Sequence, residues 1–277
     1  MSSFRTSSVF KFTRDYELLQ KIIRDGIIPN YCEEDLSFGN TQFVVGIPMA
    51  SFCDIPLTLL DDHNKRYGNY GIALSKDWAI KRGLTPVMYI ANYDVIEAIH
   101  FHHDKNTKMI KMCRDYCEKI SNTLPNTIQF LELTRLIGAK QEHVINTHII
   151  GYLKKYESVY RGKPINNYEE NEWRFLVPDQ YGTRWFWSRQ KYEKWRFPKG
   201  NKESDKPSPN KELRKYTLKY DLNDISYILI KDEEFKSRLI TFIKKLKTIG
   251  GNPVANETQK DDLISRIITL EQVKNDF

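Results

Sequence analysis

The sequence predicts a mixed α+β fold. Short apolar or alternating runs, which are typical of strands, lie on both sides of a central region. That region, residues 94–160, carries apolar side chains at three-to-four spacing, which is typical of helices. A chain of 277 residues with 40% hydrophobic and 29% charged side chains is long enough for one sizeable core. We therefore expect a single domain over residues 1–277 with a helical insertion at about 94–160.

The N-terminal segment is predicted to pass from a strand into a helix. Residues 9–12 form the expected strand. Thr13 can cap the next helix because its hydroxyl can accept a hydrogen bond from a backbone N–H of the first turn. Gly26 is expected to end this helix. Its apolar face consists of Leu18, Leu19, Ile22 and Ile23.

The next strands are predicted from apolar runs bounded by turn residues. Residues 43–52 suit a buried strand that bends near Pro48. Residues 67–74 suit another strand, after which Ser75 opens a short helix. A further strand is expected at residues 86–90.

After the insertion the chain returns to strand character. Residues 173–177 and 181–187 flank a glycine-containing turn, so a β-hairpin is the simplest interpretation. Strands are then expected at residues 216–220 and 225–230, and a C-terminal helix at 235–246.

Positive charge is concentrated in one segment. The net charge is +7, and the stretch from Arg184 to Lys219 holds twelve Lys and Arg against four Asp and Glu. Within it, residues 188–212 have the composition of a flexible basic loop, and aromatic side chains are interleaved with the cations. Such a segment could bind nucleic acid by contacting phosphates and stacking on bases. The plainer interpretation is a solvated loop whose aromatic residues anchor it to the core.

Several classes of protein are not favoured. The longest apolar runs fall far short of the roughly 20 residues that cross a bilayer, and the N-terminus lacks the apolar run of a secretory signal. We therefore expect a cytoplasmic protein without a membrane partner. Four cysteines are too few for a disulfide scaffold, so free thiols are expected.

Metal binding and cysteine catalysis have weaker support. Three histidines precede two cysteines that share a helix face, but this spacing alone does not bring the two groups together, and we predict no metal site. Cys53 could act as a nucleophile with His63 as base, although a cysteine in an apolar strand is usually inert packing. The metal candidates are His100, His102, His103, Cys113 and Cys117.

Three segments carry the main candidate site. The strand at 10–13 places its polar residues on one face, and glycines flanking the tyrosines near residue 70 let the backbone approach a flat ligand. Alternation also puts Glu172 and Arg174 on one strand face, where a simple ion pair is the alternative reading. The candidate residues are Lys11, Thr13, Ser51, Tyr67, Tyr70, Glu172 and Arg174.

These segments, taken in order, resemble the AbiGi-like proteins of bacterial abortive phage-infection systems. The similarity rests on residues 12–13, 47–57, 67–78 and 172–175 and runs over most of the chain. The resemblance implies anti-phage defence as the antitoxin-type member of a toxin–antitoxin pair, with a toxin as partner.

A weaker similarity is to the ADP-ribosyltransferase core, which binds NAD in a cleft lined by three strands. Its matching positions are Lys11 or Thr13, Tyr70 and Glu172. The similarity implies an ADP-ribosyltransferase-like β core with the helical insertion and a C-terminal strand and helix.

In such a site each residue would have a definite role. Glu172 would stabilise the oxocarbenium-like ribose that forms when the nicotinamide bond breaks. Tyr70 would stack on nicotinamide, and Lys11 would hold the ribose. The remaining contacts to NAD would come from Thr13, Ser51, Tyr67 and Arg174.

Three functions remain open at this point. In the transferase core, histidine usually stands where this chain has Lys11, and an ammonium cannot reproduce the donor and acceptor geometry of imidazole. The fold without the activity would be a non-catalytic antitoxin that binds its toxin through the basic segment around Lys191, Lys194 and Arg196. Binding of nucleic acid by that segment is the third alternative.

Overall fold

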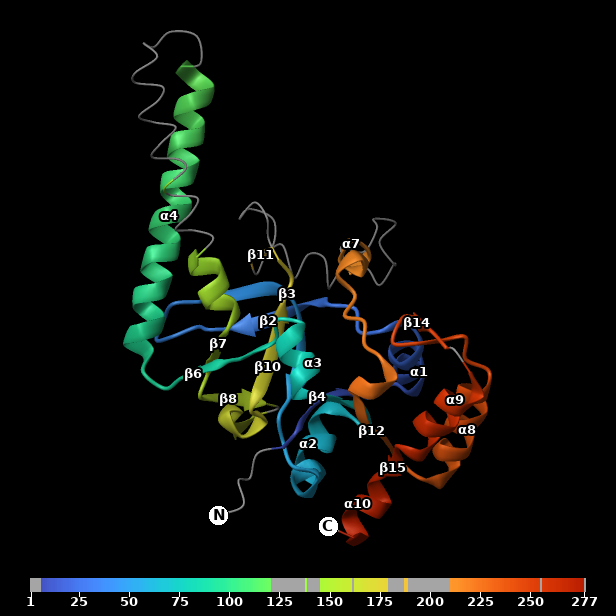
Figure 1. The fold of residues 1–277 in the computed structure, drawn as a ribbon. Coiled ribbons are helices and arrows are strands. Elements are labelled where there is room, and N and C mark those ends of the chain that lie inside the picture. The colour runs from blue at the N-terminus through green and yellow to red at the C-terminus, as the bar shows by residue number, and fades with distance from the viewer. Residues whose placement is uncertain are drawn as a thin grey trace, which may run out of the picture.

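The computed structural model describes residues 6–120, 138, 145–160, 162–178, 187–188, 210–254 and 256–276. A central sheet has helices packed around it, and one long helix, α4 (Tyr93–Ile120), extends away from the body (Figure 1). The mixed α+β class is confirmed. Within the described ranges, no helix is both long and apolar enough to cross a membrane.

The central sheet contains nine strands among the described residues, and seven of them follow the order β15-β12-β4-β1-β3-β10-β5. The other two, β2 and β11, both pair with β3. Only β12 and β15 run parallel in this sheet as described. The strands are β1 (Ser8–Thr13), β2 (Asn30–Asp35), β3 (Val44–Cys53), β4 (Tyr70–Ser75), β5 (Thr85–Pro86), β10 (Glu172–Leu176), β11 (Trp187–Ser188), β12 (Ile225–Ile230) and β15 (Ile267–Thr269).

Three two-stranded sheets surround the central one. They pair β6 (Met88–Ile90) with β7 (Leu153–Lys155), β8 (Glu157–Tyr160) with β9 (Lys163–Asn166), and β13 (Thr248–Ile249) with β14 (Asn252–Pro253). Further helices are α1 (Tyr16–Asp25), α2 (Leu60–Tyr67), α3 (Lys76–Lys81), α7 (Asn210–Leu213), α8 (Glu233–Lys244), α9 (Glu257–Ser265) and α10 (Leu270–Asp276), and residues 145–151 are also helical. The 3-10 turns are η1 (Leu57–Leu59), η2 (Asn167–Glu170), η3 (Arg214–Tyr216) and η4 (Leu222–Asp224).

Alternation along the central strands creates two apolar faces. On the first, Val9, Ile72 and Phe52 pack with residues of α1, α3, α8 and α9, and we name it the α1 face. On the second, Phe10 and Ala73 pack with residues of η1, α2 and α10, and we name it the α2 face. Neighbouring residues of one strand therefore serve separate cores.

A third core lies under α4. The N-terminal half of β3 contributes Val45, Ile47 and Met49, which pack against Ile96 of α4 and Leu153 of β7. This core fixes β2, β3 and β7 relative to one another and so positions the strand residues that carry charge.

Several predicted elements are confirmed with shifted ends. The strand predicted at 9–12 is β1, and the helix that ends before Gly26 is α1. Thr13 is not the cap of α1, because β1 runs through it. Asp15 caps the helix instead, and its carboxylate accepts a hydrogen bond of 2.8 Å from the backbone N–H of Glu17.

The second arm of the expected hairpin, residues 181–187, lies outside the described residues except for Trp187, which begins β11. β10 and β11 both pair with β3, which is ten residues long and accepts them one after the other. Other predictions were wrong. The expected strand at 216–220 is instead η3 followed by a single bridge between Ile27 and Leu218. The last part of the region predicted as helical, residues 153–160, lies in β7 and β8.

Candidate functional site

Charged side chains from five elements of the chain meet in the interior, and we call them the ion cluster. β10 contributes two, and the others come from β2, β7, η2 and the end of α2. Five ion pairs connect them, and each includes at least one side chain that is less than 10% exposed. The cluster consists of Glu34, Arg66, Lys154, Glu170, Glu172 and Arg174.

Glu172 lies at the centre of the ion cluster and is 5% exposed. Its Oε1 accepts a hydrogen bond of 2.7 Å from Nε of Arg174. Its Oε2 accepts from Nζ of Lys154 at 2.6 Å and from Nη2 of Arg174 at 3.2 Å. Both oxygens of this carboxylate are therefore bound by cations of the protein itself.

Arg174 joins Glu172 to β2 and to the segment before β7. Its Nη2 also donates to Oε2 of Glu34, and its Nη1 donates to the backbone oxygens of Gly151 at 2.9 Å and Leu153 at 3.2 Å. A planar guanidinium is suited to bridging two carboxylates, because its five N–H donors are held in a fixed fork. The side chain is 1% exposed, so it is a core residue.

The cluster continues to α2 through Glu170. Nζ of Lys154 lies 2.6 Å from Oε2 of Glu170, whose Oε1 accepts hydrogen bonds from Nη1 of Arg66 at 3.3 Å and from the hydroxyl of Tyr67. Three carboxylates thus face three cations, and the cluster is formally neutral. Buried charges are tolerated when they are paired in this way.

The pKa directions favour the ionised forms of Glu172 and Lys154, whereas burial raises the pKa of Glu34. Burial by itself raises the pKa of Glu172, but the charges of Arg174 and Lys154 outweigh burial and hold it well below its usual range. Burial lowers the pKa of Lys154, whereas Glu172 and Glu170 raise it further, so that it lies well above the ordinary value. Such a carboxylate neither exchanges protons near neutral pH nor offers a free oxygen.

The structure brings three of the predicted site residues together and separates others. Glu172 and Arg174 belong to the ion cluster, and the hydroxyl of Tyr67 donates a hydrogen bond to Glu170 of the same cluster. Pairing registers place Lys11 beside Ile72 and therefore on the α1 face together with Tyr70. Glu172 pairs with Cys53, which belongs to the α2 face. The proposed transferase triad therefore does not converge on one sheet face.

The remaining predicted residues have local roles. Tyr70 is 8% exposed, and its ring centroid lies 5.5 Å from that of Tyr16 and 5.2 Å from that of Phe235. Thr13 pairs with Tyr70 and accepts a hydrogen bond of 3.1 Å from the backbone N–H of Asp15. The carbonyl oxygen of Ser51 accepts a hydrogen bond of 3.0 Å from Nζ of Lys11.

The alternative chemistries find little support among the described residues. Burial raises the pKa of Cys53, which keeps its thiol protonated and unreactive. In the part of the chain that the structure describes, no three His, Cys, Asp or Glu side chains are grouped to hold a metal. The side chains of His63, Cys113 and Cys117 lie outside the described residues.

Sequence reasoning missed Glu34 and Lys154. Glu34 lies between Cys32 and Leu36, each two residues away, and this alternation indicates a strand with one inward carboxylate. Lys154 lies in a region that was predicted as helical, so no pattern linked it to Glu172. Their convergence depends on strand pairing between distant segments.

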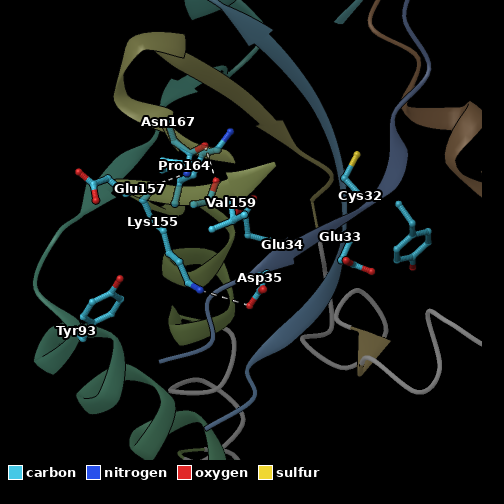
Figure 2. Close-up of a pocket in the computed structure, with 13 residues that line it drawn as sticks. Cys32, Glu33, Glu34, Asp35, Tyr93, Lys155, Glu157, Val159, Pro164 and Asn167 are labelled. Atoms are coloured by element: carbon cyan, nitrogen blue, oxygen red, sulfur yellow. Dashed lines mark hydrogen bonds and ion pairs between the residues drawn. The ribbon is translucent and has the colours of Figure 1, made fainter. Parts of the chain in front are cut away.

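A pocket of about 1100 Å³ lies beside the ion cluster, and we call it the β2 groove. Consecutive β2 residues form one side, and the hairpin of β8 and β9 forms the other (Figure 2). Glu33, Asp35 and Glu157 line it and are exposed, and Lys155 lies 3.7 Å from Asp35. Val159 adds an apolar side chain that is 72% exposed.

Comparison with known proteins places the chain. The family model described as "Putative abortive phage resistance protein AbiGi, antitoxin" matches residues 25–231, well over half of the chain. The chain belongs to the AbiGi family. It is also 28% identical over 240 residues to "Abortive phage resistance protein AbiGi" of Lactococcus lactis subsp. cremoris, which covers 83% of this chain and 89% of that protein. No solved structure matches.

The AbiGi match covers the ion cluster and the β2 groove but not the first strand. It contains every residue of the ion cluster and the whole β2 groove, whereas Lys11 and Thr13 precede it. The similarity to ADP-ribosyltransferases is not confirmed by these matches. Lys191, Lys194 and Arg196 lie outside the described residues.

Proposed function

We propose that this chain acts in anti-phage defence as a non-catalytic antitoxin that binds and neutralises a partner toxin. The names of the matched family and of the Lactococcus protein support the defence role. The observation that carries the binding mechanism is the β2 groove, an open acidic surface that lies beside the formally neutral ion cluster.

The groove has the chemistry of a protein-binding surface. Glu34 and Lys154 are neutralised within the ion cluster, and Asp35 is paired with Lys155. Glu33 and Glu157 therefore give the rim its net negative charge. The exposed side chain of Val159 provides apolar contact area at the rim. A partner with a basic segment fits this combination, because charge complementarity speeds encounter and apolar contact stabilises the complex.

The strand at the groove also offers a mode of docking. In the described part of the chain, β2 pairs with β3 and with no other strand. An edge strand can accept an extended peptide by main-chain hydrogen bonding. We propose that a basic extended segment of the toxin docks along β2 in this way.

A transferase activity is less well supported by the geometry. The carboxylate that would stabilise a ribosyl cation is already neutralised by Arg174 and Lys154. Isothermal titration with NAD, repeated with Glu172→Gln and Tyr70→Ala, distinguishes the two mechanisms. A transferase site requires that both substitutions reduce the heat of NAD binding. The antitoxin mechanism predicts no such loss.

A growth-rescue assay tests the proposed function. Cells that express the partner toxin should survive when this chain is co-expressed, and the double charge reversal Glu33→Lys/Glu157→Lys should abolish survival. The matched control Glu233→Lys/Glu234→Lys makes the same charge change at exposed positions of α8. Equal rescue by both variants, with both folded by thermal melting, would contradict the proposal.

A further inference from the structure

A second pocket lies on another part of the molecule, beside α1. Its volume is about 700 Å³, and the walls come from β1, α1, the segment that leads into β2, and Arg214 and Thr217 at the two ends of η3. It shares no residue with the β2 groove. The apolar side chains Leu18, Ile22, Ile27 and Ile28 line it together with basic ones. Four cationic side chains line this pocket against one carboxylate.

The charges of this pocket are not balanced within the protein. Arg24 binds Asp25 through two hydrogen bonds, of 2.8 and 2.6 Å, so these two cancel. Lys11, Lys21 and Arg214 make no ion pair with a carboxylate within the described ranges. The pocket therefore carries a net charge of about +3 by formal counting of its lining residues.

Lys11 is the most informative of the three cations. It is half-buried on the central strand β1, and its Nζ donates to the carbonyl oxygen of Ser51 and lies 5.8 Å from the ring centroid of Phe52. A carbonyl and a ring face compensate an ammonium only in part. An anion bound in the pocket would supply the missing counter-charge.

We propose that this pocket binds a small phosphorylated ligand of nucleotide size. Its volume falls in the range typical of small-molecule sites, about 300–1000 Å³. Lys11, Lys21 and Arg214 would contact the phosphate groups, since charge-assisted hydrogen bonds to phosphate are short and strong. The apolar wall on α1, including Ile22, would pack against the base. The inference is independent of the toxin-binding proposal, because it uses a different pocket.

Isothermal titration of the full chain with ATP and, separately, with inorganic pyrophosphate tests this proposal. ATP should bind, and Lys11→Gln should weaken it by about tenfold or more, as expected for loss of one hydrogen bond to a charged group. The double variant Lys21→Gln/Arg214→Gln should weaken it at least as much, and both of its positions are exposed, so folding is not at risk. The control Lys236→Gln removes a lysine of α8 and should leave binding unchanged.

The outcomes separate the parts of the proposal. Tighter binding of ATP than of pyrophosphate supports a nucleotide ligand, and equal affinity would overturn the role of the apolar wall. Absence of binding to the wild-type chain at millimolar ATP and pyrophosphate would overturn the site. Binding that survives in both Lys11→Gln and the double variant would overturn the assignment to this pocket.

Discussion

The ion cluster and the pocket beside α1 differ in how their charged side chains are compensated. In the cluster, Glu172 and Arg174 are bonded to each other and to further charged partners, and they tie β10 to β2 and β7. In the pocket, Nζ of Lys11 contacts the carbonyl oxygen of Ser51 and the ring of Phe52. Glu172 and Arg174, the most conspicuous charged motif of the sequence, therefore have a structural role, whereas Lys11 is proposed to bind a ligand.

The largest effect is expected when the cluster loses its bridging cation. Arg174→Met leaves Glu34 and Glu172 buried without their shared partner, and we expect a loss of about 3–5 kcal/mol in the free energy of unfolding. Urea unfolding measures it. Lys108→Met, which removes an exposed cation of α4, should change stability by less than about 0.5 kcal/mol. Similar values for the two variants would show that the cluster is not structural.

Lys154→Met should have the next largest effect. It leaves Glu170 and Glu172 without their common cation, which should cost roughly 3 kcal/mol of unfolding free energy in the same urea experiment. If Lys154→Met leaves the free energy of unfolding unchanged or raises it, Lys154 is, like Lys11, a cation that the fold does not require.

Acid should lower the free energy of unfolding, and part of this loss should depend on Glu172. Its pKa is depressed in the folded state, so its stabilising contribution is complete above the unfolded-state value of about 4.3 and is lost as pH falls toward the lower folded-state value. Unfolding free energy should therefore drop more steeply below about pH 4.3 in the wild type than in Glu172→Gln. Burial raises the pKa of Glu34, which acts with the opposite sign, so the informative quantity is the difference between the two proteins. Parallel pH profiles would contradict the assignment.

The smallest expected effect has the opposite sign. Lys11→Met removes a half-buried cation that has no carboxylate partner among the described residues, so the ligand-free protein should gain up to about 1 kcal/mol in stability. Thermal melting without added nucleotide or phosphate measures it. A clear loss of stability would show that the contacts of Lys11 with Ser51 and Phe52 are structural.

Local patterns allowed much of the fold to be predicted. The strands that became β1, β3 and β12 and the helix α8 carry their signal within a few residues. Predictions failed where the secondary structure of a segment depends on pairing with a strand that is distant in the sequence. Residues 153–155 belong to the region predicted as helical, but they form β7, which pairs with β6.

The candidate site was predictable only in part, for the same reason. Alternation correctly placed Glu172 and Arg174 on one face of a strand. It could not show that Tyr70 and Lys11 lie on the other face of the sheet, because the face depends on the register of β1, β3 and β10. Nor could it find Lys154, whose contacts with Glu172 depend on the packing of β7 against the sheet.

Amide hydrogen exchange with and without the toxin tests most directly whether the chain docks its partner in the β2 groove. The account predicts slower exchange on binding at Asn30–Asp35 of β2 and in the hairpin of β8 and β9, with little change around α8. Protection confined to α4 or to the pocket beside α1, with β2 unchanged, would contradict it.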